Sequence, residues 1–122
     1  MHSTTPQNIG IDLVELDDFA QRLDARLLKR LLSPAERDRY ERITHPQRKL
    51  EYAAGRFAAK EAYTKAYRHF DEPLNFTDVM ILEDDTGAPI VVSRYRPTDR
   101  VQVSISHTRH YVVAIVSVHK AP

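Results

Sequence analysis

The chain has 122 residues, is 42% hydrophobic and contains no cysteine, which fits one compact domain that builds its core without disulfides. The lack of cysteine excludes zinc–cysteine sites and thiol catalysis. Residues 1–8 are polar and no stretch approaches the roughly 20 apolar residues of a membrane span. We therefore expect a cytoplasmic protein with a polar tail over 1–8 and a single domain over 9–122.

Charge is unevenly distributed, although the formal net charge is only +1. Between Arg22 and Arg68 there are 13 Lys or Arg residues against 6 Asp or Glu, whereas the rest of the chain has 5 against 11. A basic middle segment would attract a phosphate-bearing ligand or an acidic partner, and a merely solvated helix surface is the alternative.

The N-terminal part predicts a short strand followed by a helix. Alternation over residues 9–14 indicates the strand and places Asp12 on the opposite side from Ile11 and Leu13. An apolar residue at every fourth position then predicts one amphipathic helix. Its apolar residues are Phe19, Leu23, Leu27 and Leu31, and its other face carries Arg22, Arg26, Lys29 and Arg30.

Two further helices are expected in the basic segment. The Ser33-Pro34-Ala35-Glu36 motif is typical of a helix start, because serine can cap, proline fits the first position and glutamate completes a capping box. This helix should end near Thr44. The residue before a proline is disfavoured in helical geometry, so His45-Pro46 interrupts the chain and a long helix follows over about 47–68.

Beyond Pro73 the pattern becomes that of antiparallel strands. The Asp84-Asp85-Thr86-Gly87 turn and the His107-Thr108-Arg109-His110 loop each separate two alternating segments. These strands are expected over 76–82, 88–95, 101–106 and 111–119. The sequence thus predicts an α+β fold with one early strand, three helices and then an antiparallel sheet of two hairpins packed on the long helix.

Glu61 is the unusual residue of the long helix. At about 100° per residue it projects into an apolar stripe, with Lys65 one turn further on. The stripe consists of Leu50, Ala53, Ala54, Phe57 and Ala58. Burying an unpaired carboxylate would cost several kcal/mol, so we expect compensation by Lys65 at the favourable i, i+4 spacing, by another protein group, or by a cation that carries a phosphate ligand.

Asp12 offers a second carboxylate, since aspartate is uncommon in strands. It either caps a turn or, if the first strand lies along the long helix, converges with Glu61. Two carboxylates together with substrate phosphates and water form a typical magnesium site. Lys65 would then be placed to meet a phosphate oxygen.

Other candidate residues carry weaker signals. His107 stands at a strand end, where its side chain either leaves the sheet or is incidental. Arg48 and Arg56 add positive charge to the long helix. With glycine only at positions 10, 55 and 87, the sequence has no Walker A loop or dinucleotide fingerprint, so phosphate binding must rely on side chains or a helix end.

Three segments resemble the signature motifs of a known family. Residues 10–16 (GIDLVEL) and 55–66 (GRFAAKEAYTKA) are similar to the two signature motifs of bacterial holo-acyl-carrier-protein synthases, the short phosphopantetheinyl transferases. Residues 101–108 (VQVSISHT) resemble the third motif. The resemblance follows the right order over nearly the whole chain, and it implies the phosphopantetheinyl transferase fold.

The resemblance also implies an activity and a site. The enzyme would transfer 4′-phosphopantetheine from coenzyme A to a serine hydroxyl of apo acyl carrier protein and release adenosine 3′,5′-bisphosphate. Asp12 and Glu61 would hold Mg²⁺, and Lys65 would bind the diphosphate. The family positions near the nucleotide are matched by Arg48, Arg56 and His107. The resemblance further implies a homotrimer with sites at subunit interfaces, and neither nucleic acid nor membrane as a partner.

Two departures from the family pattern concern ligand recognition. Residues 68–73 stand where the family has a glycine-rich loop, and they contain no glycine. Asp17-Asp18 stands where a basic residue that meets the acidic carrier is common. Carrier binding would then rest on the basic residues Arg22, Arg26, Lys29 and Arg30. The resemblance leaves open whether the carrier serves fatty acid biosynthesis or secondary metabolism.

Two other functions are compatible with these residues. One is a non-catalytic relative that binds coenzyme A or a carrier without transfer, which the altered 68–73 segment suggests. The other is a magnesium-dependent nuclease or phosphohydrolase built on Asp12, Glu61 and Lys65. The second is disfavoured because Glu61 and Lys65 have helical spacing, whereas restriction-type nucleases carry Glu-x-Lys on a strand.

Overall fold

The structure, a computed structural model, describes residues 7–67 and 74–120. Its elements are β1 (Gln7–Glu15), α1 (Leu16–Arg22), α2 (Ala25–Leu31), α3 (Pro34–Arg42), α4 (Pro46–Tyr67), the 3-10 helix η1 (Phe76–Asp78), β2 (Val79–Glu83), β3 (Pro89–Ser93), β4 (Arg100–His107) and β5 (Tyr111–His119). This order confirms the α+β class. The last residue of the expected long helix, Arg68, lies outside the described residues.

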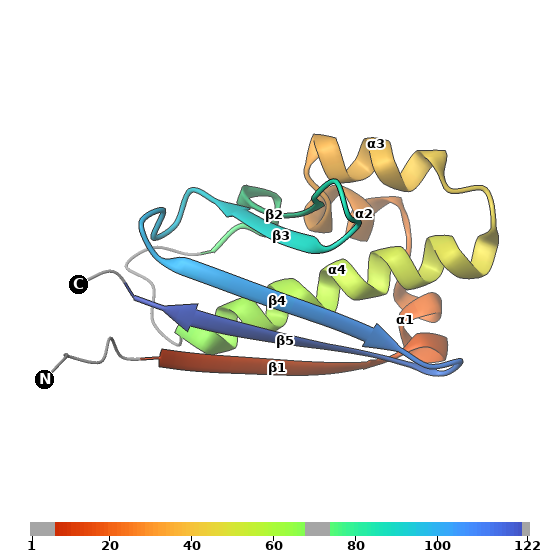
Figure 1. Cartoon of the computed structure of the whole chain (residues 1–122). Helices are drawn as coiled ribbons and strands as arrows, with labels where there is room; N and C mark the ends of the chain where they lie inside the picture. Colours follow the sequence, from red (N-terminus) through yellow and green to blue (C-terminus); the bar gives the residue numbers. More distant parts are fainter. Residues whose placement is uncertain (1–6, 68–73, 121–122) are drawn as a thin grey trace, which may run out of the picture.

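The strands form two antiparallel sheets instead of the expected single sheet of two hairpins. The first sheet has the order β1-β5-β4, so the early strand pairs with the last one, and β2 and β3 form a separate hairpin. In Figure 1 the three-stranded sheet lies along one side of α4, while α2, α3 and the β2–β3 hairpin lie on the other side. The two sheets share no backbone pairing among the described residues, although β3 lies next to β4.

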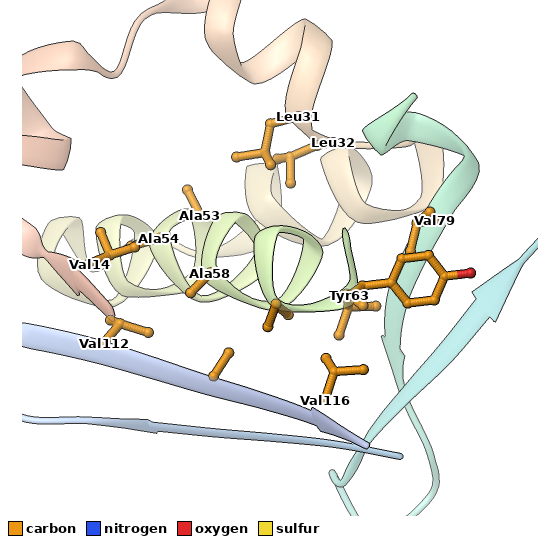
Figure 2. Packing of buried hydrophobic residues seen from close by; sticks show 14 of the residues in the cluster. Val14, Leu31, Leu32, Ala53, Ala54, Ala58, Tyr63, Val79, Val112 and Val116 are labelled. Carbon is orange, nitrogen blue, oxygen red and sulfur yellow. The ribbon is translucent and has the colours of Figure 1, made fainter. Parts of the chain in front are cut away.

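Helix α4 is buried on both sides because its middle is rich in small residues. Figure 2 shows Ala58 on the side that faces Val112 and Val116 of β5, and Ala53 on the side that faces Leu31. All five side chains are at most 1% exposed. Alanine side chains let neighbouring elements approach closely, and a helix with apolar residues all round is typical of such a central position.

Gly10 allows β1 to lie directly against α4. A Cβ atom at this position would collide with the carbonyl oxygen of Ala62 and would lie 2.7 Å from the amide nitrogen of Ala66. Successive residues of a strand point to opposite faces, so Asp12 shares this α4-facing side. The predicted opposition of Asp12 to Ile11 and Leu13 is confirmed, because these two apolar side chains are 54% and 65% exposed on the other face.

The expected single helix from Phe19 to Leu31 is wrong. Helix α1 ends at Arg22, Leu23 adopts an extended conformation, and the Asp24 side chain accepts a hydrogen bond from the backbone nitrogen of Leu27 at 2.8 Å. Aspartate caps helix starts better than it continues a helix, which explains the break. The described residues therefore contain four α-helices where three were expected.

The other boundaries follow the sequence pattern closely. The predicted capping box is confirmed, since the Ser33 hydroxyl accepts from the Glu36 backbone nitrogen and the Glu36 carboxylate accepts from the Ser33 backbone nitrogen. The strand expected over 76–82 begins with η1 and becomes β2 only at Val79. The turn after β2 is held by the Asp84 carboxylate, which accepts from Thr86.

Candidate active site

Strand β1 and helix α4 bring Asp12, Glu61 and Lys65 together. The Lys65 ammonium group donates to Asp12 Oδ1 at 2.9 Å and to the carbonyl oxygen of Ile11 at 3.2 Å. The Asp12 side chain is 14% exposed, and that of Lys65 is 55% exposed. Lys65 of α4 is thus paired with Asp12 of β1. The i, i+4 pairing of Lys65 with Glu61, one of the expected possibilities, is not formed among the described residues.

Glu61 is a half-buried carboxylate without a partner in the described part of the chain. No hydrogen bond or ion pair within 7–67 and 74–120 involves its side chain. Burial raises the pKa of Glu61, the negative charge of Asp12 raises it further, and Lys65 and Arg22 partly oppose this effect. A half-buried carboxylate beside a second negative charge is a suitable place for a cation.

The charged residue that α4 buries completely is Lys60, not Glu61. Lys60 is 0% exposed and forms an ion pair with Glu36, which is also 0% exposed. Burial lowers the pKa of Lys60, and the Glu36 charge opposes this effect. The apolar stripe did not identify the most buried charge of α4, because this alanine-rich helix is covered on two sides. Glu61 lies at the margin of the buried surface.

A second group of predicted residues lines one cavity of about 640 Å³ between α3, α4, the β2–β3 turn and β4. This cavity contains Arg48, Arg56 and His107. Arg56 is almost buried, donates from Nε to the carbonyl oxygen of Ile81 at 3.2 Å, and places its guanidinium 4.0 Å from the ring centroid of Tyr52. The protein therefore holds this guanidinium at a fixed position in the cavity wall.

Further basic residues in the same cavity escaped the sequence analysis. Arg39, Arg42 and His45 also line it, which gives a concentration of positive charge suited to phosphate groups. His107 is only partly free, because its Nδ1 lies 3.6 Å from Glu51 Oε2. The positions of Arg39 and Arg42 on α3 offered no signal, since charged residues on a short helix are ordinarily solvated.

The two groups of residues lie on different sides of α4. Arg56 and Glu61 are five positions apart, which separates them by about 140° around the helix axis. Arg48 lies 13 positions before Glu61, or about 20 Å along the axis. Asp12 and Glu61 (the carboxylate pair) therefore face different surroundings from the cavity that Arg48 and Arg56 line (the basic cavity) within one chain.

Two of the four residues predicted to bind a carrier protein line a cavity of about 590 Å³ beside Glu61. Lys29 and Arg30 line this cavity together with Phe57 and Glu61. Arg22 places its guanidinium 5.8 Å from the ring centroid of Phe57, and Arg26 is exposed on α2. The basic residues of α1 and α2 are thus continuous with the neighbourhood of Glu61.

The comparison with known proteins explains why these motifs occur together. The profile of the 4′-phosphopantetheinyl transferase superfamily matches residues 8–116. The chain belongs to this superfamily. It is 41% identical over 108 residues to the holo-[acyl-carrier-protein] synthase of Acholeplasma laidlawii, which covers 88% of this chain and 92% of that protein. The corresponding Geobacillus protein is 42% identical over 115 residues, or 92% and 95% of the two chains.

Solved structures agree with this assignment. The holo-(acyl-carrier-protein) synthase of Bacillus anthracis, in complex with CoA (3′,5′-ADP), has a TM-score of 0.84 and 36% identity over 93% of this chain and 96% of that one. The Helicobacter pylori enzyme in complex with coenzyme A has a TM-score of 0.75 and 29% identity over 90% and 98%. The resemblance to this family of phosphopantetheinyl transferases and its fold is thereby confirmed.

In this phosphopantetheinyl transferase, the signature segments lie on three elements. Segment 10–16 covers most of β1, segment 55–66 is the second half of α4, and segment 101–108 covers most of β4. Segment 68–73, where the family has its glycine-rich loop, lies outside the described residues. Asp17 and Asp18 are exposed in the first turn of α1. Among the described residues, no helix is long and apolar enough to cross a membrane.

Proposed function

We propose that this transferase moves 4′-phosphopantetheine from coenzyme A to a serine hydroxyl of apo acyl carrier protein. The serine oxygen forms a bond to the phosphorus that carries pantetheine and gives up its proton to water, the bond from that phosphorus to the bridging oxygen of coenzyme A breaks, and adenosine 3′,5′-bisphosphate leaves with the bridging oxygen. The observation that carries this proposal is the meeting of Asp12, Lys65 and the unpaired Glu61 at the junction of β1 and α4. Relatives about 40% identical are holo-[acyl-carrier-protein] synthases.

Asp12 and Glu61 are proposed to hold Mg²⁺. Both are hard oxygen donors, and Glu61 has no ionic partner in the described part of the chain. Within 7–67 and 74–120, no three His, Asp or Glu side chains are grouped to hold a metal ion. Two carboxylates suit Mg²⁺, which commonly takes its remaining ligands from water and substrate phosphates. When bound, the ion would neutralise charge on the diphosphate.

Lys65 is proposed to bind the diphosphate. Its side chain is more than half exposed although the ammonium group pairs with Asp12, so it can reach a ligand from its present position. A fixed positive charge beside the transferring phosphoryl group stabilises the charge that develops there, which is the main task in this chemistry.

The nucleotide end of coenzyme A is proposed to bind in the basic cavity that contains Arg48, Arg56 and His107. The cavity volume of about 640 Å³ falls within the usual range for a ligand of this size. The buried anchoring of Arg56 by the Ile81 carbonyl oxygen supports a role in recognition, because a guanidinium held in place loses little freedom when it binds phosphate.

The proposed oligomer is a homotrimer with active sites at its interfaces. One face of β1 and β5 exposes a continuous set of large apolar side chains: Ile9, Ile11, Leu13, Tyr111 and Ile115 are 43% to 65% exposed. Such a patch is typical of a surface that a partner covers. Assembly would also explain why the carboxylate pair and the basic cavity face different sides of α4, since neighbouring subunits could each supply one half of a site.

A transfer assay with apo acyl carrier protein, coenzyme A and Mg²⁺ tests the function. We expect the carrier to gain the mass of one phosphopantetheine group on its serine, as measured by intact-protein mass spectrometry. Glu61→Ala and removal of Mg²⁺ should each lower the rate of this mass gain by about 100-fold or more. Glu41→Ala, which changes an exposed glutamate of α3, should leave the rate unchanged.

Other outcomes would point to the alternative functions. Binding of coenzyme A or carrier without any mass gain across a panel of apo carriers would indicate a non-catalytic relative. Magnesium-dependent cleavage of nucleic acid in the absence of a carrier would indicate a nuclease.

A further inference from the structure

The ammonium group of Lys60 connects three parts of the chain inside the core. It donates to the carbonyl oxygen of Leu31 at 2.6 Å, to Glu36 Oε1 at 2.6 Å and to the carbonyl oxygen of Phe76 at 2.8 Å. A lysine ammonium has three donors, so all of them are used. The acceptors belong to the end of α2, to α3 and to the start of η1.

Glu36 completes this network from the other side. Its Oε1 accepts from the Ser33 backbone nitrogen at 2.9 Å, and its Oε2 accepts from the Ile81 backbone nitrogen at 2.8 Å. The carboxylate therefore joins the start of α3 to β2. No buried side-chain nitrogen or oxygen among the described residues lacks a hydrogen-bond partner, so the Lys60–Glu36 network is fully satisfied.

Leu31 and Phe76, whose backbone carbonyls accept from Lys60, line opposite walls of the cavity beside Glu61. Phe57 and Glu61 of α4 line this cavity of about 590 Å³, one wall comes from α2 and includes Leu31, and the other consists of residues 74–77. Phe76 also meets Phe57 edge-on, with ring centroids 6.3 Å apart. Lys60 is thus placed to set the distance between the walls.

A buried ion pair is a weak way to stabilise a fold. Desolvation of both charges offsets most of their attraction, and well-packed apolar residues of similar volume are often as stable. What Lys60 provides is directional: three hydrogen bonds fix the positions of their acceptors, whereas apolar packing allows small shifts. The neighbouring Glu61 makes the geometry of this cavity relevant to the reaction.

We propose that Lys60, held by Glu36, is a positioning residue that sets the shape of the cavity beside Glu61 in which the acyl carrier protein docks. This inference rests on the proposed function, because the carrier is assigned to this cavity through the basic residues Lys29 and Arg30 on its α2 wall. Lys60 touches no reacting atom. It acts through the α2 wall and the 74–77 wall.

The decisive variant removes both charges together. Lys60→Met alone would leave Glu36 buried and unpaired, so the double variant Lys60→Met/Glu36→Gln is used. We expect it to fold and to raise the KM for apo carrier by about tenfold or more, because displaced walls misplace the docked partner. Its KM for coenzyme A should change much less than the carrier KM, because the amide oxygen of residue 36 can still accept from the backbone nitrogen of Ile81, the residue whose carbonyl oxygen anchors Arg56. A carrier KM equal to that of the wild type would overturn the inference.

Two controls separate positioning from stability. Val118→Ala removes a fully buried side chain of β5, and it should lower Tm without changing the KM for the carrier. If the double variant does not fold, Glu36→Asp decides the matter, since it keeps a negative charge for Lys60 but withdraws the carboxylate by one methylene, and it should still raise the carrier KM. An unchanged carrier KM in a folded Glu36→Asp protein would contradict the proposal.

The same assay distinguishes this inference from the function on which it rests. A wild-type protein that modifies no carrier would overturn both. A wild-type protein that modifies its carrier, with a folded double variant of unchanged carrier KM, would overturn the role of Lys60 alone.

Discussion

At the scale of single residues, the neighbouring charged side chains of α4 differ in their partners. Lys60 is fully buried and donates all three of its hydrogen bonds to protein groups. Glu61 is half-buried and is left without a protein partner among the described residues. Lys65 is exposed and tied to Asp12. The unpaired member of the group is the one that a ligand or a cation must satisfy.

The raised pKa of Glu61 predicts how the stability of the metal-free protein depends on pH. Burial and Asp12 raise the folded-state pKa of Glu61 above 4.5, so the folded protein binds this proton more tightly than the unfolded chain. Ionisation therefore destabilises the fold, fully so above the folded-state pKa. In EDTA at neutral pH, Glu61→Gln should raise Tm by about 2–4 °C.

The pH series supplies the control for this measurement. The advantage of Glu61→Gln should shrink as the pH falls through the folded-state pKa and disappear below 4.5, because the glutamate is then protonated in both states. Glu41→Gln should show the opposite sign or no effect, since the Arg37 side chain lowers the pKa of Glu41. A gain in Tm that is independent of pH would speak against the electrostatic explanation.

At the scale of elements, the site depends on how closely β1 approaches α4. Asp12 reaches Lys65 only because Gly10, two residues earlier on the same face, leaves room for the backbone of Ala62 and Ala66. The small residues of α4 serve the same purpose on its other contacts. Close packing of two backbones is what turns separate motifs into one site.

Substitution of Gly10 tests this dependence. Gly10→Ala places a Cβ against the backbone of Ala62, where no side-chain rotation can relieve the clash. We expect the free energy of unfolding to fall by about 3 kcal/mol, at the upper end for overpacking, as measured by urea denaturation. Transfer activity should fall at temperatures where the variant is still folded, because Asp12 moves with β1.

Gly55→Ala is the matched control. Its Cβ would be 3.4 Å from a side-chain methyl of Ile105, and alanine favours a helix interior over glycine by about 1 kcal/mol. This variant should be as stable as the wild type or more so. Equal stability of Gly10→Ala and Gly55→Ala would show that β1 is not confined by α4.

At the scale of the whole molecule, the outer face of the three-stranded sheet is an exposed apolar surface: Ile9, Ile11, Leu13, Tyr111 and Ile115 lie on it. Its apolar side chains are 43% to 65% exposed, so the core does not use them. The carboxylate pair and the basic cavity also remain apart within one chain. A trimer would account for both observations.

The oligomeric state can be measured directly. Leu13, 65% exposed on β1, should tolerate a charge in the monomer but not in an interface, because a buried unpaired carboxylate costs several kcal/mol. If the wild-type protein is the proposed trimer, we expect Leu13→Glu to be monomeric in light scattering at micromolar concentration and to lose activity. Ala35→Glu, on the exposed side of α3, should change neither. A trimeric Leu13→Glu protein would exclude this face as the interface.

Much of the architecture follows from local sequence patterns. The capping box at Ser33, the proline break at Pro46 and the alternating strands are local signals, and each appears in the structure. The Asp24 cap is also local, but the regular spacing of leucines across it indicated one continuous helix. Strand pairing between β1 and β5 joins residues about a hundred positions apart, which no local pattern reports.

The sequence by itself determined the motifs, the superfamily and the candidate residues Asp12, Glu61 and Lys65, because these depend on residue type and spacing. Only the tertiary structure decided which charges are paired. The Lys60–Glu36 bridge and the Lys65–Asp12 pair both join distant segments, and an alanine-rich helix buried on two sides does not show which of its charges lies inside. Pairing depends on which elements cover the helix, and that is a property of the folded chain.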